Sequence, residues 1–233
     1  MGLAERMSGV LEHLIRHDVF HLGPVVITST VVHTWIIMVV LFVVVFLFTR
    51  GLRAAAYSDE PTPRRALLEL AVEGFYGLTD PVLGVEGRKY VPFIGTYFIF
   101  ILFMNLSWFI PDMVPPTSDI MTTAALAIVG IVFVIASGIR AQGLGPYLHH
   151  FTQPLPFMLP LNIVEELVRP FSLAVRLFGN IFGGKMVVLV FGMLAPLVLP
   201  IPIMGLEVLF GTIQAFVFAL LLVTYLQGAI HGH

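Results

Sequence analysis

Five long apolar stretches, separated by short polar segments, constrain this chain more than any other feature of its sequence. Each stretch is about 20 residues or longer, which is the length that an α-helix needs to cross the hydrocarbon core of a bilayer. Hydrophobic residues make up 58% of the 233 residues and charged residues only 11%, with a mean hydropathy of +0.97. Soluble domains contain about 25% charged residues. The sequence therefore predicts an all-α polytopic membrane protein that forms a single integral membrane domain.

The last two of these stretches are longer than a bilayer requires. The predicted membrane helices are residues 28–48, 91–110, 120–139, 162–194 and 203–227. The fourth helix is predicted to begin at Asn162, because Asn162 with Glu165 resembles an N-cap box. A helix of about 30 residues measures roughly 45 Å, compared with a hydrocarbon core of about 30 Å. We therefore expect the last two helices to tilt strongly, or the fourth to break at Pro170.

Residues 64–83 form an amphipathic segment that is too polar to cross the membrane. Its apolar side chains include Leu67, Leu70 and Phe75, whereas Glu69 and Glu73 occupy another side. A helix of this kind lies in the membrane interface with its apolar face toward the acyl chains. The sequence therefore predicts an interfacial helix between the first two spans.

The polar amino-terminal segment, residues 1–24, precedes the first apolar stretch. Residues 4–21 are predicted to be helical, with histidines at every fourth position, namely His13, His17 and His21. This spacing could bind a metal ion on one helix face. Solvated interfacial histidines are the favoured interpretation, because no further acidic or histidine partner is obvious nearby. We therefore predict no metal site and no cofactor.

The charges of the chain exclude some partners and predict its orientation. A net charge of −2 argues against a nucleic-acid partner, and the absence of cysteine excludes disulfides and cysteine metal sites. If there are five spans, the loops on one side hold Arg50, Arg53, Arg64, Arg65, Arg88, Lys89, Arg140 and Arg169. The opposite loops, 111–119 and 195–202, hold no basic residue. The positive-inside rule then places the amino terminus outside and the carboxyl terminus in the cytoplasm, in a bacterial inner membrane.

One arginine, Arg176, lies in the middle of the fourth apolar stretch. A guanidinium does not lose its proton to escape a low dielectric, so its burial in a membrane costs on the order of 3 kcal/mol. Ser172 and Asn180 lie one turn before and one turn after it, on the same helix face. A snorkelling or structurally paired arginine is the alternative interpretation. The distance of Arg176 from the flanking charges, and its polar face, favour a functional role.

Other polar residues lie within or beside the predicted spans. Glu207 and Gln214 are seven residues apart, so they share one face of the last helix about 10 Å apart. Ionisable groups at membrane depth usually mark an ion or proton path. We expect an outward polar patch with Asp119 and Asn105, and a cytoplasmic patch with Glu165, separated by Arg176. For Asn105, Thr122 and Thr123, ordinary interhelical hydrogen bonds are an equally good interpretation.

The string SLAVRLFGN, which contains Arg176, resembles the signature of subunit a, the membrane stator of rotary F-type ATP synthases. Glu207 and Gln214 in GLEVLFGTIQAFVFALLLVTYL fit the last helix of the same family. The resemblance covers nearly the whole chain. It implies a non-catalytic, ion-translocating subunit whose partners are the subunit c ring, the subunit b peripheral stalk and the other ATP synthase subunits, in a lipid bilayer.

The resemblance also implies a mechanism. Arg176 faces carboxylates that move past it on the subunit c ring, and two aqueous half-channels lead to it, lined by Asn180, Gln214, Glu207, Lys185, Glu165, Asp119, Asn105 and Ser172. A fixed cation between the half-channels repels protons, which prevents a continuous leak. It also favours the ionised form of a carboxylate that passes close to it. Proton flow is thereby coupled to ATP synthesis.

Lys185 departs from the family pattern, in which a glutamate or a histidine usually stands at this position and at the position of Glu207. A lysine is a poor proton relay, because its ammonium holds its proton firmly. A hairpin between the last two helices would bring both side chains to a similar depth. We therefore predict a structural ion pair between them, with proton relay by Lys185 as the alternative.

Two other function classes deserve comparison with the stator hypothesis. A secondary transporter for a small ion or solute would contain internal repeats, and the sequence shows none. An intramembrane metalloprotease is suggested superficially by Glu165 and Glu166 near Arg169, with His149 and His150 before them. The spacing of the glutamates from the arginine is unlike that of such enzymes, and no histidine occurs between His150 and His231.

Overall fold

The computed structural model describes residues 18–22, 25–50, 63–110, 113–150, 157, 159–194 and 200–231. Within these residues, five helices are long and apolar enough to cross a membrane. They are α2 (Ser29–Thr49), α5 (Val91–Leu106), which spans only together with the 3₁₀ turns before and after it as Val85–Phe109, α6 (Ile120–Gln142), α8 (Leu159–Leu194) and α9 (Pro200–His231). The predicted helical fold with five membrane-span helices, the last two long, is confirmed.

Shorter elements connect the long helices. They are strands β1 (Asp18–Leu22) and β2 (Val25–Thr28), helices α4 (Pro63–Leu83) and α7 (Leu144–His150), and 3₁₀ helices η1 (Val85–Tyr90), η2 (Ser107–Phe109) and η3 (Pro116–Ser118). Helix α4 coincides with the predicted interfacial helix and leaves Leu67 and Leu70 exposed. Its position in a membrane interface stays a prediction.

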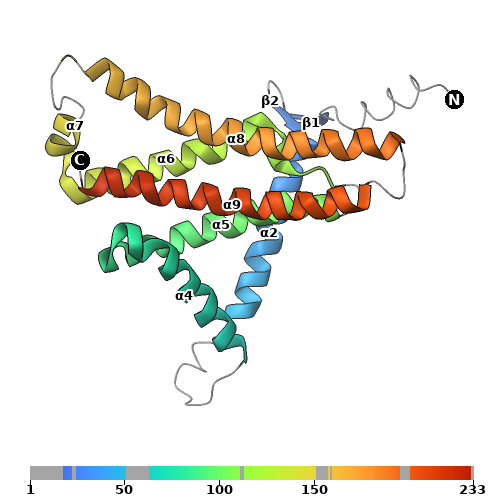
Figure 1. The fold of residues 1–233 in the computed structure, drawn as a ribbon, viewed down its shortest axis with the longest axis horizontal. Coiled ribbons are helices and arrows are strands. Elements are labelled where there is room, and N and C mark those ends of the chain that lie inside the picture. The colour runs from blue at the N-terminus through green and yellow to red at the C-terminus, as the bar shows by residue number, and fades with distance from the viewer. Residues whose placement is uncertain are drawn as a thin grey trace.

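Helices α8 and α9 lie side by side along the longest axis of the molecule (Figure 1). Helix α9 packs against α5, α6 and α8, so it lies at the centre of the bundle. The core contains fully buried side chains from all four helices, namely Ile101, Val134, Leu177, Phe218 and Leu222. This core holds α8 and α9 in a fixed position relative to α5 and α6.

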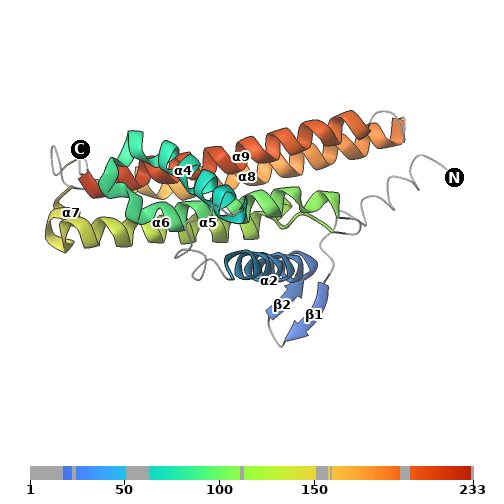
Figure 2. The same ribbon diagram turned by 90° about the horizontal axis from the view of Figure 1, so that it is seen from below.

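Helix α2 is attached to the rest of the bundle over a small area. It lies on one side of α5 and α6, whereas α8 and α9 lie on the other (Figure 2). Within α2, Ile37 and Leu41 are its buried hydrophobic residues. A polar contact supplements them: Thr30 Oγ1 donates to Asp119 Oδ2 over 3.0 Å, and Asp119 also caps α6 by accepting from the Met121 backbone N–H at 3.0 Å. Asp119 therefore links α2 to the start of α6.

The amino-terminal segment differs from its prediction. Strands β1 and β2 pair antiparallel, with His21 opposite Val26. The prediction of a helix over residues 4–21 is therefore wrong for residues 18–21, while residues 4–17, with His13 and His17, lie outside the described part of the chain. The sequence after His21 explains the difference, because Gly23 and Pro24 disfavour a helix and the β-branched run Val-Val-Ile-Thr favours a strand.

Helix α8 also begins earlier than predicted. It starts at Leu159, so Asn162 lies inside the helix and the predicted N-cap box is wrong. Pro160 explains the earlier start, because proline is well tolerated in the first turn of a helix. The helix then continues through Pro170 without a break. Of the two predicted ways to fit a long helix into a bilayer, a break at Pro170 is therefore excluded.

Candidate functional site

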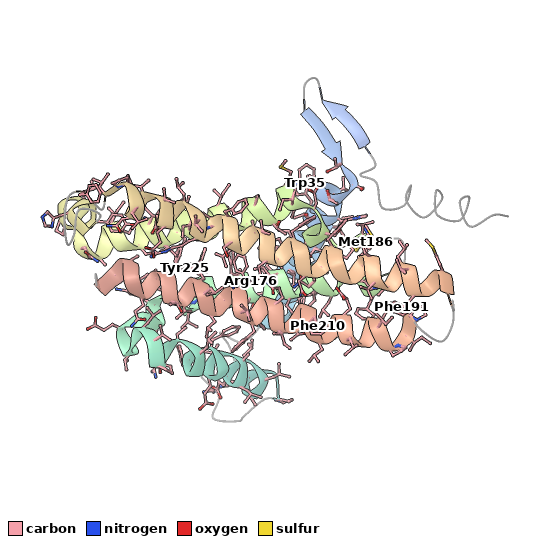
Figure 3. All side chains as sticks on the ribbon, turned by 45° about the horizontal axis from the view of Figure 1, so that its top comes forward. Trp35, Arg176, Met186, Phe191, Phe210 and Tyr225 are labelled. Atoms are coloured by element: carbon pink, nitrogen blue, oxygen red, sulfur yellow. The ribbon has the colours of Figure 1, made fainter. Side chains whose placement is uncertain are left out.

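Two contacts show which residues of α8 and α9 lie next to each other. Asn180 Nδ2 donates to the Phe210 carbonyl oxygen over 3.3 Å. Farther along the pair, the Arg169 guanidinium carbon lies 5.3 Å from the centroid of the Tyr225 ring. In an antiparallel pair, a turn toward the amino terminus of α8 corresponds to a turn toward the carboxyl terminus of α9. Arg176 therefore lies at the level of Gln214, between the levels of Tyr225 and Phe210 (Figure 3).

Arg176 and Gln214 differ in their surroundings. The Arg176 side chain is exposed, and it forms no ion pair or hydrogen bond with any other described residue. Gln214 is buried, with 8% of its surface accessible. Ser172, one turn before Arg176 on α8, is partly buried. An unpaired, permanent positive charge thus lies on the open side of α8, at the level of a buried amide of α9.

A cavity of about 610 Å³ separates the carboxyl-terminal part of α8 from the amino-terminal part of α9. Phe191 and Phe210, which are labelled in Figure 3, belong to its wall. Its polar lining comes from Asn180 and Glu207, and the remaining lining residues are Gly179, Gly183, Gly184, Val187, Phe191, Pro202, Ile203, Leu206 and Phe210. Gly179 and Asn180 lie one turn from Arg176, so the cavity leads from the Glu207 end of the helix pair toward the arginine.

The predicted ion pair between Lys185 and Glu207 does not form. Neither side chain makes an ion pair within the described part of the chain, and Lys185 is buried with 7% of its surface accessible. Glu207 instead reaches across to Gly184, the residue before Lys185. The two residues therefore lie at a similar depth, as predicted, but their side chains do not meet. Successive residues of a helix differ by about 100° around its axis, so Lys185 points away from the cavity.

Asn105 holds α9 from the side opposite Asn180. It is buried at 5% accessibility, and its Nδ2 donates to the Gly211 carbonyl oxygen over 2.9 Å. Its Oδ1 is buried without a hydrogen-bond partner. Asn105 and Asn180 therefore bind successive carbonyl groups, those of Gly211 and Phe210. For Asn105 the geometry fits the interpretation as an interhelical hydrogen bond; Thr123 hydrogen-bonds within its own helix, to the Ile120 carbonyl.

Charges at the other end of the α8–α9 pair form ion pairs. Arg169 Nη2 contacts Glu165 Oε1 at 3.1 Å, and Arg169 Nη1 contacts Glu166 Oε2 at 2.8 Å. The Glu165 side chain is 65% exposed and that of Glu166 only 19%. Burial raises the pKa of the Tyr147 hydroxyl of α7; Glu166 adds to this shift and Arg169 opposes it. Two glutamates, one arginine and two tyrosines thus join α7, α8 and α9.

The sequence-predicted residues are only partly brought together. Asn180 and Glu207 share the cavity, with Arg176 and Gln214 one turn beyond it. Lys185, Asn105 and Asp119 do not line the cavity. Two residues of the site were not predicted from the sequence: Glu166, which is the more buried partner of Arg169, and Gly184. The three-residue spacing of Glu166 and Arg169 was a usable signal for the first, whereas nothing in the sequence marks Gly184.

The comparison with known proteins gives a clear result. Residues 31–227 match the family described as "ATP synthase A chain". The chain belongs to the ATP synthase A chain family. The protein named "ATP synthase subunit a" of Moorella thermoacetica is 53% identical over 223 residues, which cover 96% of this chain and 100% of that protein. Legionella pneumophila has a relative of the same name that is 36% identical over 222 residues, 95% of each chain.

Membership of the ATP synthase A chain family confirms the resemblance that SLAVRLFGN indicated. The chain is a multi-pass membrane subunit of an ATP synthase, associated with the other subunits of that complex, and it belongs to the proton channel of the membrane sector. "ATP synthase subunit a 2" of Bradyrhizobium sp. is similar over most of its length too, at 43% identity over 91% of this chain and 92% of that protein. The match supports neither the transporter nor the protease alternative.

Proposed function

We propose that Arg176 is the separator between two proton half-channels and that it faces the rotating subunit c ring. The observation that carries this proposal is the exposed, unpaired guanidinium one turn beyond the end of a cavity. A structural arginine would have a carboxylate partner, as Arg169 has. A permanent cation without a partner is free to interact with a carboxylate on another subunit, and its charge favours the ionised form of that carboxylate.

The cavity between α8 and α9 serves as the half-channel that opens to the outside. Glu207 and Asn180 supply polar groups along its wall, and Gln214 lies beyond it at the level of Arg176. The second half-channel begins at the Arg169 end of the helix pair, where Glu165 is exposed and Glu166 partly buried. Two glutamates and one arginine leave a net negative charge there, which attracts protons. Protons pass from one half-channel to the other only by way of the c ring.

The surface around Arg176 suits a partner made of apolar helices. The exposed side chains near its level are apolar, with Phe171 and Val175 on α8 and Ile213 and Phe216 on α9. An apolar face of this kind contacts lipid or another membrane helix. A single cation in such a face is best explained by a partner that brings a buried carboxylate to the same depth. The subunit c ring has this chemistry, and the peripheral stalk subunit b holds the stator in place.

The arrangement of the helices supports a strong tilt of α8 and α9. Helix α2 contains 21 residues, about 32 Å at 1.5 Å per residue, which fits a hydrocarbon core of about 30 Å without much tilt. In Figure 1, α8 and α9 run across the direction of α2. Helices α8 and α9 therefore lie at a large angle to the membrane normal. The basic loops place the amino terminus outside and the carboxyl terminus in the cytoplasm.

Proton pumping by the reconstituted complex tests the proposal. Arg176→Ala should reduce ATP-driven proton pumping into vesicles to background, while the amount of assembled complex is retained, because no internal ion pair is lost. Arg140→Ala is the matched control, since Arg140 is an exposed arginine at the end of α6 and outside the cavity. Vesicles without the c ring should show no coupled flux. Normal pumping by Arg176→Ala would refute the separator role.

A further inference from the structure

The Glu207 carboxylate lies directly against the α8 backbone at Gly184. A Cβ atom at position 184 would overlap with Oε2, Cδ and Oε1 of Glu207. Nonbonded atoms do not approach this closely, so any side chain at position 184 would force the carboxylate to move. The side chain of Glu207 thus extends from α9 across the cavity to the opposite wall.

The close approach is specific to one of three neighbouring glycines. Gly179, Gly183 and Gly184 all line the cavity, but a Cβ atom at position 179 or 183 would meet nothing within 4 Å. Glu207 makes no hydrogen bond or ion pair with the other described residues. The bare backbone of Gly184 therefore leaves the space that the Glu207 carboxylate occupies.

We propose that Gly184 is a positioning residue for proton transfer through Glu207. Because Gly184 has no side chain, the carboxylate reaches α8 one turn from Asn180 and two turns from Arg176, about 12 Å along the helix. A proton carrier must come within hydrogen-bond reach of the next group or of one bridging water. The inference rests on the proposed role of the cavity as a half-channel, and it adds a residue that carries no functional group of its own.

The substitution Gly184→Ala tests the inference without weakening the fold. Alanine has a higher helix propensity than glycine, and the atoms in the way are the end of a flexible side chain. We expect ATP-driven pumping per assembled complex to fall about tenfold, as for a proton-transferring group moved out of reach. Gly205→Ala is the matched control and should pump like the unmodified protein, because Gly205 lies in α9 outside the cavity and a Cβ atom there would meet nothing within 4 Å. Equal pumping by both variants would overturn the inference.

A second substitution separates positioning from a general packing defect. Glu207→Asp shortens the side chain by one methylene and should itself reduce pumping, because the carboxylate no longer reaches α8. Combined with Gly184→Ala, the shorter side chain leaves room for the new methyl group. If the two substitutions acted independently, the double variant would show the product of the two single effects on pumping or assembly. We expect the double variant to exceed that product. The combination of Glu207→Asp with the control Gly205→Ala should equal that product. The same independence for Gly184→Ala would refute positioning.

The variant Glu207→Gln distinguishes this inference from the function on which it rests. If Glu207→Gln pumps normally, the cavity carboxylate is not part of the proton path and the proposed half-channel is wrong. If Glu207→Gln pumps poorly but Gly184→Ala pumps normally, the half-channel stands and only the positioning role of Gly184 fails. Pumping is measured in vesicles after quantifying the copurified subunit.

Discussion

The charged side chains at the two ends of the α8–α9 pair differ in whether they form ion pairs. At the Arg169 end, the guanidinium contacts two carboxylates and lies over the Tyr225 ring. In the middle and at the Glu207 end, Arg176, Lys185 and Glu207 form no ion pair within the described residues. A cavity of about 610 Å³ opens at the second end.

This difference separates charges that hold helices from charges that are available to move protons. A paired charge at membrane depth is stabilised by its partner and resists a change of protonation. An unpaired charge costs more to bury, so its presence needs another explanation. We propose that the unpaired charges serve proton translocation, with Glu207 as a carrier and Arg176 as a fixed charge that faces the c ring. At the other end, the ion pairs of Arg169 fix the positions of Glu165 and Glu166 at the start of the proposed second half-channel.

The largest effects are expected at the unpaired end. Glu207→Gln should reduce pumping strongly, because a cavity carboxylate is lost, while Lys185→Met should leave assembly intact, because no carboxylate loses its partner. Since the two side chains are not paired, a double-mutant cycle should give a coupling free energy below about 0.5 kcal/mol. Pumping rates and the amounts of assembled complex for the four proteins provide the measurement. A coupling free energy of several kcal/mol would show that the two side chains do form an ion pair.

A smaller effect of a different kind is expected at the paired end. Arg169→Ala removes two ion pairs and a stacking contact, so the purified subunit should lose on the order of 1–2 kcal/mol of stability. Pumping should be reduced but not abolished, the reverse of the pattern for Arg176→Ala. Thermal unfolding in detergent measures the first quantity and vesicle pumping the second. Arg169→Lys should be intermediate, because lysine keeps the charge but not the forked geometry.

Much of this contrast was not visible in the sequence. Hydropathy predicted the long helices, because membrane spans need apolar side chains over a fixed length. Arg176 was identified because a charge in an apolar run is rare, and the string around it indicated the family. The face of α8 that meets α9 could not be predicted, because a rotation of about 100° separates Gly184 from Lys185 and only the packing of the helices sets it.

The errors at the ends of elements have similar causes. Residues 18–21 pair with the strand that follows them instead of forming a helix, because the β-branched run Val-Val-Ile-Thr favours a strand. The predicted start of α8 was wrong because Asn162 and Glu165 match a capping pattern but lie inside a helix that begins at Leu159. Local patterns suggest where a helix can start, and the longer apolar context decides which of them is used.

The smallest effect is expected at an exposed ion pair outside the α8–α9 pair. Arg88 Nη2 lies 2.6 Å from Asp80 Oδ2, across a turn in which Gly84 has a φ of 67°, so that α4 is joined to η1. Because the pair is exposed, it is screened by water and salt. Asp80→Asn should therefore leave pumping at pH 7 nearly unchanged and lower the thermal midpoint of the purified subunit only slightly.

The pH dependence of that small shift follows from the carboxyl group of Asp80. The hydrogen bond from Arg88 lowers its pKa below the ordinary value. A lowered folded-state pKa means that the stabilisation is complete above the unfolded-state pKa, about 4, and is lost as the pH falls through the lower folded-state value. The difference in midpoint between the native subunit and Asp80→Asn should thus be present at pH 7, shrink in about 1 M salt, and disappear in strong acid. A difference that is independent of both salt and pH would show that Asp80 stabilises the turn by packing and not through its charge.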